Sequence, residues 1–353
     1  MKAFIEKYQK APVDERANQA PSHPKVSVCV QTYQHAAYIA QCIESILMQK
    51  TDFDIEILIG EDDSSDGTRE ICEQYAYSWP DKIRLFLHSR ENNIPLNGHP
   101  SGRFNFVYNL AQARGDYIAF CEGDDYWNDK YKLQKQVDAF EAEKELGIVY
   151  TGFVQLHQKS GKPETMDFQQ SMGERCRGWI FPDLLKGNWL GTATVMVKKK
   201  DLLHFVDYDE FTRENFPMAD YPTWLELAYR KKVAYLPDKT AVHRVLENSA
   251  SQSVKASKRA EFIEAQHKIK KHFIKKYNLG DEMEAAIDEG IYRKRIQYAF
   301  FTKDKALSEK AKTALEKQGN KLSLKEQFYY RLLKTGFLGS FLRKILTRIG
   351  VKV

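Results

Sequence analysis

Cysteine is scarce in this sequence, and its distribution argues against the sites that cysteines usually build. The chain of 353 residues contains 5 cysteines, and no two of them are separated by two residues, as they are in the common zinc and redox motifs. Three lie inside apolar patterns, so we interpret them as small buried hydrophobic residues. Scattered cysteines of this kind are typical of a reducing compartment, and we therefore expect a cytoplasmic protein.

Long apolar segments are also missing. No uninterrupted apolar stretch approaches the roughly 20 residues that a membrane-spanning helix needs, and the N-terminus has no long apolar core, so we expect no signal peptide. The formal net charge is +6. That modest excess suits an anionic substrate or an anionic membrane surface, but it is equally compatible with neither, and we do not expect a nucleic acid partner.

The glycine-rich nucleotide motifs are absent as well. Neither a P-loop nor the pattern GxGxxG follows the first predicted strand, residues 26–33. A dinucleotide-binding dehydrogenase and a kinase-type site are therefore disfavoured. The length is enough for about two domains, and the apolar content is that of an ordinary globular protein.

Apolar runs of strand type alternate with segments of helical periodicity in the first third of the chain. Strands are predicted at 26–33, 55–60, 82–87 and 117–120, with helical segments between them. This alternation predicts βαβ units and right-handed crossovers. The expected fold class is α/β, with a mostly parallel sheet flanked by helices.

The stretch 117–127 is the most informative part of the sequence. A buried strand ends in Glu122, Asp124 and Asp125, and like charges packed together are unfavourable unless a cation joins them. Mg²⁺ and Mn²⁺ take oxygen ligands, and Mg²⁺ often binds carboxylates together with substrate phosphates. The stretch predicts a site for a divalent cation and a diphosphate. A solvated acidic turn that caps the next helix is the alternative.

Three strand ends should meet at one edge of the sheet, where open α/β sheets bind ligands. They carry Thr32 and Tyr33, then Glu61, Asp62 and Asp63, and then the acidic stretch. A nucleotide fits this set, because Tyr33 can stack on a base and an early carboxylate can accept a hydrogen bond from base or ribose. The alternatives are that Tyr33 is a core residue and that Asp63 and Asp66 cap the following helix.

The pattern after residue 127 is less regular. We expect a helix at 128–143, strands at 147–156, 192–197 and 233–236, the last ending at Pro237, and a loop from Gly161 to Arg177. Asp220 lies at the start of a further predicted helix. Local chemistry alone favours a helix N-cap at that position.

Taken together, these pieces resemble the family 2 glycosyltransferases, which have the GT-A fold. The resemblance covers residues from about Lys25 to about Ser253. It rests on the order and spacing of 26–33 (VSVCVQTY), 61–68 (EDDSSDGT), 113–120 (ARGDYIAF), 122–127 (EGDDYW), 132–136 (KLQKQ) and 219–222 (ADYP). It implies transfer of a sugar from a nucleoside-diphosphate donor to a hydroxyl of a glycan or lipid-linked acceptor, with inversion and with a divalent cation, Mn²⁺ or Mg²⁺.

The resemblance also implies residue roles. Thr32, Tyr33 and Asp62 match nucleotide-contacting positions, with Glu61 and Asp63 beside them. Asp124 matches the metal ligand, Glu122 and Asp125 match contacts to ribose, sugar or metal, and Asp220 matches the catalytic base. The chain departs from the family at Glu61, where Asp is common, and at Ala219, which replaces a carboxylate.

A further departure concerns the histidine that relatives often carry near the end of the domain. That histidine falls on Leu246 here, so His243 is either a substitute metal ligand or a surface or packing residue. Arg244 remains a predicted diphosphate contact, because a guanidinium forks well onto phosphate oxygens.

The last third of the sequence is helical and charged. We expect a lead-in at 1–24, a glycosyltransferase domain at 25–253 and a helical extension at 254–353. Bulky apolar residues among basic ones from Phe328 to Ile349 predict either a helix on an anionic membrane surface, which would make the protein peripheral on the inner face, or a helix packed on protein. Two other functions stay open, a sugar-phosphate nucleotidyltransferase and a non-catalytic sugar-nucleotide binding module.

Overall fold

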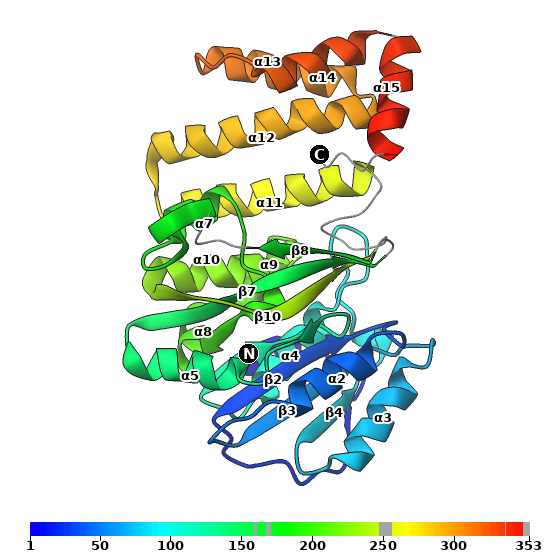
Figure 1. The fold of residues 1–353 in the computed structure, drawn as a ribbon, viewed down its shortest axis with the longest axis vertical. Coiled ribbons are helices and arrows are strands. Elements are labelled where there is room, and N and C mark those ends of the chain that lie inside the picture. Colours follow the sequence, from blue (N-terminus) through cyan, green and yellow to red (C-terminus); the bar gives the residue numbers. More distant parts are fainter. Residues whose placement is uncertain (159–160, 167–170, 247–255, 336, 349–353) are drawn as a thin grey trace. The chain divides into compact units, whose positions relative to one another are not determined.

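A mixed β-sheet runs through the first of the two units into which the chain divides, residues 1–245 and 246–353 (Figure 1). The computed structural model describes residues 1–158, 161–166, 171–246, 256–335 and 337–348. The strands are β1 (Asp14–Glu15), β2 (Val26–Thr32), β3 (Ile55–Glu61), β4 (Ile83–Leu87), β5 (Tyr117–Phe120), β6 (Tyr126–Trp127), β7 (Leu146–His157), β8 (Lys162–Met166), β9 (Met196–Lys198) and β10 (Lys232–Val245).

Helices flank this sheet on both faces. They are α1 (Lys2–Tyr8), α2 (Ile39–Leu47), α3 (Thr68–Ser78), α4 (Arg103–Gln112), α5 (Lys132–Ala142), α7 (Phe181–Lys186), α8 (Lys199–Phe205), α9 (Tyr208–Arg213) and α10 (Asp220–Arg230). The strand order is β1-β4-β3-β2-β5-β9-β7-β10-β6, with β8 beside β7. Strands β4, β3, β2 and β5 are mutually parallel, and so are β7 and β10, whereas β9 lies antiparallel between these two groups. The predicted α/β class with a mostly parallel sheet is confirmed.

Alternation along the central strands separates the two faces of the sheet. Odd positions of β3 (Ile55, Ile57, Ile59) join the main hydrophobic cluster with residues of α2, α3 and α5. The opposite face at Gly60 receives α4 so closely that a Cβ at Gly60 would lie 1.8 Å from Oδ1 of Asn105. Strand β3 is therefore buried on both faces, as its continuous apolar run predicts.

Two predicted strands differ from the structure. Residues 192–194 form a 3-10 turn, and only Met196–Lys198 are extended. The turn is stabilised because Oγ1 of Thr194 donates to the carbonyl of Gly191. The predicted end of the last strand at Pro237 is also wrong, because β10 continues to Val245. Its register shifts between Leu236 and Lys239, and proline is tolerated in a strand at such a bulge.

Three further boundaries differ. The helix predicted at 128–143 begins only at Lys132, after the short strand β6. Part of the predicted loop 161–177 is strand β8, which pairs with β7. The predicted lead-in 1–24 contains α1 and β1, and β1 pairs with β4 at the edge of the sheet. Strands β8 and β1 gain their hydrogen bonds from a longer neighbour, which local sequence does not reveal.

The second unit is helical, with α11 (Ala256–Lys276), α12 (Gly280–Thr302), α13 (Lys305–Lys317), α14 (Leu324–Lys334) and α15 (Phe337–Arg348). Leu342 and Leu346 of α15 pack on a cluster that contains Phe300 and Tyr329. Part of the predicted amphipathic pattern therefore packs on protein. Phe328 and Phe341 are exposed, and Ile349 lies outside the described residues. Within the described ranges, no helix is long and apolar enough to cross a membrane.

Candidate active site

Three strand ends lie side by side at one edge of the sheet, because β3, β2 and β5 are adjacent and parallel. The backbone N–H of Asp62 donates to the carbonyl of Thr32 at 3.1 Å, and the N–H of Gly123 donates to the carbonyl of Gln31 at 3.0 Å. A Cβ at Gly123 would lie 2.6 Å from Oγ1 of Thr32, so only glycine permits this approach. The structure thus brings the predicted nucleotide loops and the acidic stretch together.

Tyr33 and Asp62 form a cluster with Arg90 and Asn93. The Arg90 guanidinium lies 4.0 Å from the centre of the Tyr33 ring and donates to Oδ2 of Asp62 at 2.7 Å. The amide of Asn93 donates to both oxygens of Asp62 at 3.0 Å. Burial raises the pKa of Asp62 to about 6, although Asn93 and Arg90 act in the opposite direction. Tyr33 is 40% exposed and is not a core residue.

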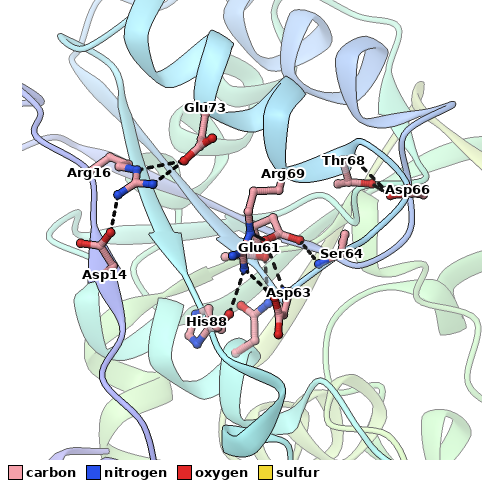
Figure 2. Close-up of polar contacts among 12 residues, drawn as sticks. Asp14, Arg16, Glu61, Asp63, Ser64, Asp66, Thr68, Arg69, Glu73 and His88 are labelled. Atoms are coloured by element: carbon pink, nitrogen blue, oxygen red, sulfur yellow. Dashed lines mark hydrogen bonds and ion pairs between the residues drawn. The ribbon is translucent and has the colours of Figure 1, made fainter.

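Glu61 is fully buried and holds the loop that carries Asp62 (Figure 2). Its carboxylate accepts from Nε of Arg69 at 2.6 Å and from the backbone N–H groups of Asp63 and Ser64 at 3.2 and 2.7 Å. Arg69 also donates to the carbonyl of His88 at 3.0 Å. These bonds use the acceptors of Glu61 inside the loop, and its nucleotide contact stays a prediction.

Asp63 adopts a left-handed backbone conformation with φ of +62°, and its carboxylate pairs with Arg69 at 3.3 Å. It therefore does not cap the following helix. Asp66 instead accepts from the N–H and hydroxyl of Thr68 at 3.1 and 2.6 Å (Figure 2), and from the N–H of Ala36 at 3.0 Å. The capping position of α3 belongs to Gly67, so neither Asp63 nor Asp66 is the N-cap. Asp66 nevertheless satisfies the N–H of Thr68, the first residue of α3, and the contact of Asp63 to a nucleotide stays a prediction.

In the acidic stretch, other residues hold the carboxylate of Asp125, whereas the carboxylates of Glu122 and Asp124 are not held in this way. Asp125 accepts from the N–H of Arg244 at 2.8 Å and contacts Nδ1 of His243 at 3.0 Å. In the part of the chain that the structure describes, the carboxylates of Glu122 and Asp124 form no ion pair and accept no side-chain hydrogen bond, whereas Asp124 accepts from its own backbone N–H. Burial and neighbouring carboxylates raise the pKa of both groups above their ordinary values.

His243 and Arg244, which lie on strand β10, contact the acidic stretch. Burial alone would lower the pKa of His243, but Asp125 and the other carboxylates outweigh it and raise that pKa to about 9. The Arg244 guanidinium lies over the rings of Tyr38 and Tyr126, at 5.1 and 4.6 Å from their centres, and donates to the carbonyl of Asp124. Both residues thus brace the acidic stretch, and their contacts to metal and diphosphate stay predictions.

Asp220 is the first residue of α10, and the capping position belongs to Ala219, which makes no side-chain cap. Oγ1 of Thr192 donates to Oδ2 of Asp220 at 3.1 Å. Burial raises the pKa of Asp220, and the charge of Asp220 contributes to the raised pKa of Glu122. The predicted base and the acidic stretch therefore act on each other electrostatically across one site.

The chemistry of these side chains fits a hard cation. Glu122 and Asp124 offer carboxylate oxygens without side-chain partners, and oxygen is the ligand type that Mg²⁺ and Mn²⁺ prefer. Among the described residues, no group of three or more His, Cys, Asp or Glu side chains is arranged to hold a metal ion. A cation at this edge would therefore take further ligands from a bound substrate or from water.

Sequence reasoning missed Arg90, Asn93, Thr192 and Arg103, which contact the predicted residues or the segments that carry them. Arg90 and Asn93 come from the segment after β4, and Thr192 comes from a turn expected to be a strand. None of them has a local pattern, because their partners are distant in the chain. Their positions would have required the sheet order, which no single motif specifies.

Comparison with known proteins identifies relatives of this chain. The family described as "Glycosyl transferase family 2" matches residues 27–196. An uncharacterized protein of Mycobacterium tuberculosis is 29% identical over 219 residues, which are 62% of this chain and 58% of that protein. The chain thus matches little more than half of the length of this relative.

Two other similar proteins are covered over most of their length. The "Putative teichuronic acid biosynthesis glycosyltransferase TuaG" of Bacillus subtilis is 30% identical over 244 residues, 68% of this chain and 87% of that protein. The structure of a mannosyltransferase from Pyrobaculum calidifontis aligns with a TM-score of 0.53 at 16% identity, over 99% of this chain and 94% of that one. This likeness confirms the predicted GT-A fold. The family match and the 30% identity to the Bacillus subtilis glycosyltransferase show that the chain belongs to glycosyl transferase family 2.

Proposed function

We propose that this protein is a glycosyltransferase that moves a sugar from a nucleoside-diphosphate donor to a hydroxyl acceptor. The observation that carries this proposal is the shared edge of β3, β2 and β5, where Tyr33 and Asp62 lie beside the carboxylates of Glu122 and Asp124. An aromatic ring, a hydrogen-bond acceptor and oxygen ligands in that order suit a base, a ribose and a diphosphate. The similarity to a putative glycosyltransferase from Bacillus subtilis supports the same reaction.

The donor nucleotide occupies the half of the site built by β2 and β3. The exposed ring of Tyr33 stacks on the base, and Asp62 accepts a hydrogen bond from base or ribose, with Arg90 and Asn93 orienting its carboxylate. Thr32, at the end of β2, is a further residue that we assign to nucleotide binding. Glu61 keeps the loop in place, and Asp63, whose side chain is 45% exposed, is a further nucleotide contact in this proposal.

Asp124 is the residue we assign to a divalent cation, Mn²⁺ or Mg²⁺, with Glu122 and Asp125 beside it and His243 as a further candidate. Such a cation, when bound, neutralises charge that grows on the departing nucleoside diphosphate. The similar mannosyltransferase from Pyrobaculum calidifontis was solved in complex with GDP-Man and Mn²⁺, which supports this assignment. Arg244 braces the same stretch and supplies positive charge near the diphosphate.

Asp220 acts as the general base in this proposal. Its carboxylate takes the proton of the acceptor hydroxyl while the hydroxyl oxygen bonds to the anomeric carbon and the bond from that carbon to the diphosphate breaks. Attack from the face opposite the leaving group inverts the anomeric centre. Thr192 donates to Oδ2 of Asp220 at 3.1 Å and helps to orient the carboxylate.

The test measures release of nucleoside diphosphate from a panel of nucleotide sugars with Mn²⁺ and candidate acceptors. Wild type should release product, and Asp220→Asn should lose on the order of 10²-fold or more in turnover while it still binds the nucleotide. Asp201→Asn is the matched control, because Asp201 is also a buried aspartate in the first turn of a helix, α8. Nucleotide binding without release by wild type would favour the non-catalytic alternative instead.

The acceptor in this proposal is a glycan or a lipid-linked glycan, with the C-terminal helices resting on an anionic membrane at its inner face. Leu324, Phe328 and Phe341 are 85%, 47% and 54% exposed, and basic residues surround them in the sequence. Apolar side chains among cations favour an anionic bilayer interface. Co-flotation with vesicles that contain anionic lipid, but not with neutral ones, is expected, and equal recovery with both would contradict it.

A further inference from the structure

One segment, residues 90–103, leads from the end of β4 into α4 and begins at the nucleotide half of the site. Arg90 and Asn93 donate to the carboxylate of Asp62 at 2.7 and 3.0 Å. The Arg90 guanidinium also lies 4.0 Å from the centre of the Tyr33 ring. A base that stacks on Tyr33 would share that ring with Arg90, so nucleotide binding acts directly on the start of this segment.

The middle of the segment is a tight hairpin. Leu96 and His99 exchange backbone hydrogen bonds at 2.8 and 3.0 Å. The two residues between them, Asn97 and Gly98, have positive φ angles of 51° and 79°, and Asn-Gly is the pair that such a two-residue turn favours. Leu96 is 4% exposed and therefore anchors the hairpin in the core, which makes it a firm support for its tip.

The tip of the hairpin holds Asn215, which lies in the connection between α9 and α10. The N–H of Asn97 donates to Oδ1 of Asn215 at 2.8 Å, and Nδ2 of Asn215 donates to Oδ1 of Asn97 at 2.5 Å. Nδ2 of Asn97 also donates to the carbonyl of Asn215 at 3.5 Å. Asn215 has a φ of +56°, a left-handed conformation that asparagine adopts more readily than most residues. These bonds join two loops that are 118 residues apart in the chain.

The C-terminal end of the segment holds the same connection. Arg103 is 3% exposed, and its guanidinium donates to the carbonyls of Phe216 and Met218 at 2.7 and 2.9 Å. A third bond goes to Oγ1 of Thr212 in α9 at 3.4 Å. Asp220 begins α10 two residues after Met218. The hairpin tip and Arg103 together therefore fix the main chain immediately before the predicted base.

We propose that residues 90–103 link nucleotide binding to the position of the base, with Asn97, Asn215 and Arg103 as positioning residues. This inference rests on the proposed function, in which Asp220 takes the acceptor proton. A nucleotide bound at the start of the segment stabilises it, and the segment holds the connection before Asp220 through direct hydrogen bonds. The positioning residues have no contact with the donor in this proposal, so their substitution should change turnover rather than nucleotide affinity.

The first test replaces the two asparagines by glycine, which adopts the same left-handed conformation but removes the side-chain bonds. Asn97→Gly, Asn215→Gly and the double variant are compared with wild type for release of nucleoside diphosphate from a nucleotide sugar. Because a small misplacement of a reacting group lowers turnover strongly, the double variant should lose on the order of 10-fold in kcat, with affinity for the nucleoside diphosphate near that of wild type. Both single variants remove the bond between the two side chains, so their effects should not add.

The second test does not depend on turnover. Hydrogen exchange of residues 214–222 is followed by mass spectrometry with Mn²⁺, with and without whichever of UDP, GDP, CDP, ADP and dTDP raises the melting temperature. In wild type the nucleotide should slow exchange in this segment, because it stabilises the structure that holds it. In the double variant this slowing should be lost, while slowing at residues 90–93 remains.

Asn278→Gly is the matched control, since Asn278 also has a positive φ, 47°, and also precedes a helix, α12 of the second unit. It should change neither kcat nor exchange at residues 214–222. Unchanged kcat in the double variant, or an equal loss in Asn278→Gly, overturns the positioning role. Exchange that the nucleotide fails to slow in wild type, or still slows in the double variant, overturns the link.

Failure of the proposed function has a different signature. Full activity of Asp220→Asn would remove the base assignment. A wild type that releases nothing from any nucleotide sugar, yet shows slower exchange at residues 214–222 with nucleotide, would remove the proposed reaction and support the link.

Discussion

Replacement of Glu61 by glutamine tests whether this residue organises the nucleotide loop. The substitution preserves the size of the side chain and removes its charge. Glu61 is fully buried and accepts three hydrogen bonds, from Nε of Arg69 and from the N–H groups of Asp63 and Ser64 (Figure 2). A glutamine has one acceptor oxygen and turns its NH₂ toward at least one of these donors.

The expected loss can be worked out from these contacts. A hydrogen bond to a charged group contributes about 1.5–3 kcal/mol. Oε2 of Glu61 accepts two of the three bonds and Oε1 accepts one, so the glutamine loses at least one bond and weakens the others by removing the charge. Arg69 is 29% exposed and also pairs with Asp63, so water and Asp63 recover part of its interaction. The loss should therefore be about 3 kcal/mol, at the low end of the range for a broken buried ion pair. In a domain of this size it corresponds to a fall of roughly 6–12 °C in melting temperature.

Glu73→Gln provides the comparison, because Glu73 lies in α3, the helix that also carries Arg69. Glu73 accepts from Arg16 at 2.5 Å, as short as the Glu61–Arg69 pair, but the two side chains are 36% and 45% exposed (Figure 2). An exposed pair contributes at most about 1 kcal/mol. Chemical denaturation of both variants measures the difference. A loss below about 1 kcal/mol for Glu61→Gln, or equal losses for the two variants, would refute the view that burial makes Glu61 the organiser of the loop.

Other predictions concern the ligand side of the site. Burial raises the pKa of Asp62 to about 6, so ionisation of Asp62 lowers the stability of wild type as the pH rises through that value. The stability of Asp62→Asn relative to wild type should therefore increase by roughly 3 kcal/mol between pH 4 and pH 8. Chemical denaturation of both proteins at both pH values measures this difference. Tyr33→Ala should weaken nucleoside-diphosphate binding by about 1–3 kcal/mol in calorimetry, and Tyr33→Phe should not. Asp124→Asn should abolish the part of the nucleotide-induced thermal shift that requires Mn²⁺ and leave the metal-free part intact.

The central part of the fold could be predicted because its signals are local. Strands β2, β3 and β5 are continuous apolar runs, and parallel pairing buries both of their faces. The antiparallel strand β9 could not be found in this way, since it is three residues long and depends on two neighbours. The continuation of β10 past Pro237 was missed for a related reason: β7 supplies a partner along the whole strand, and a bulge accommodates the proline.

The acidic residues of the site could be predicted for the same reason, since each follows a recognisable strand. Their partners could not. Arg90 meets Asp62 and Tyr33 across 28 residues or more, and Arg103 meets Met218 across 115. The position of such an arginine depends on a partner that is distant in the chain. The polar sequence around it has no periodicity that would identify it. Motifs therefore indicated which carboxylates to examine, and only the tertiary structure identified what holds them.

The contacts of Trp127 connect the two halves of the site. Trp127 follows the acidic stretch directly, and its indole N–H donates to the carbonyl of Ala193 at 2.8 Å. The neighbouring Thr192 donates to Asp220, while Gln136 donates to the carbonyl of Thr194 at 2.9 Å. The turn that orients Asp220 is thus held by the same segment that carries Asp124 and Asp125. In the proposed reaction Asp220 must lie within hydrogen-bond reach of the acceptor proton. The hydrogen bonds of Trp127, Thr192 and Gln136 therefore set the position of Asp220 relative to the acidic stretch before either substrate binds.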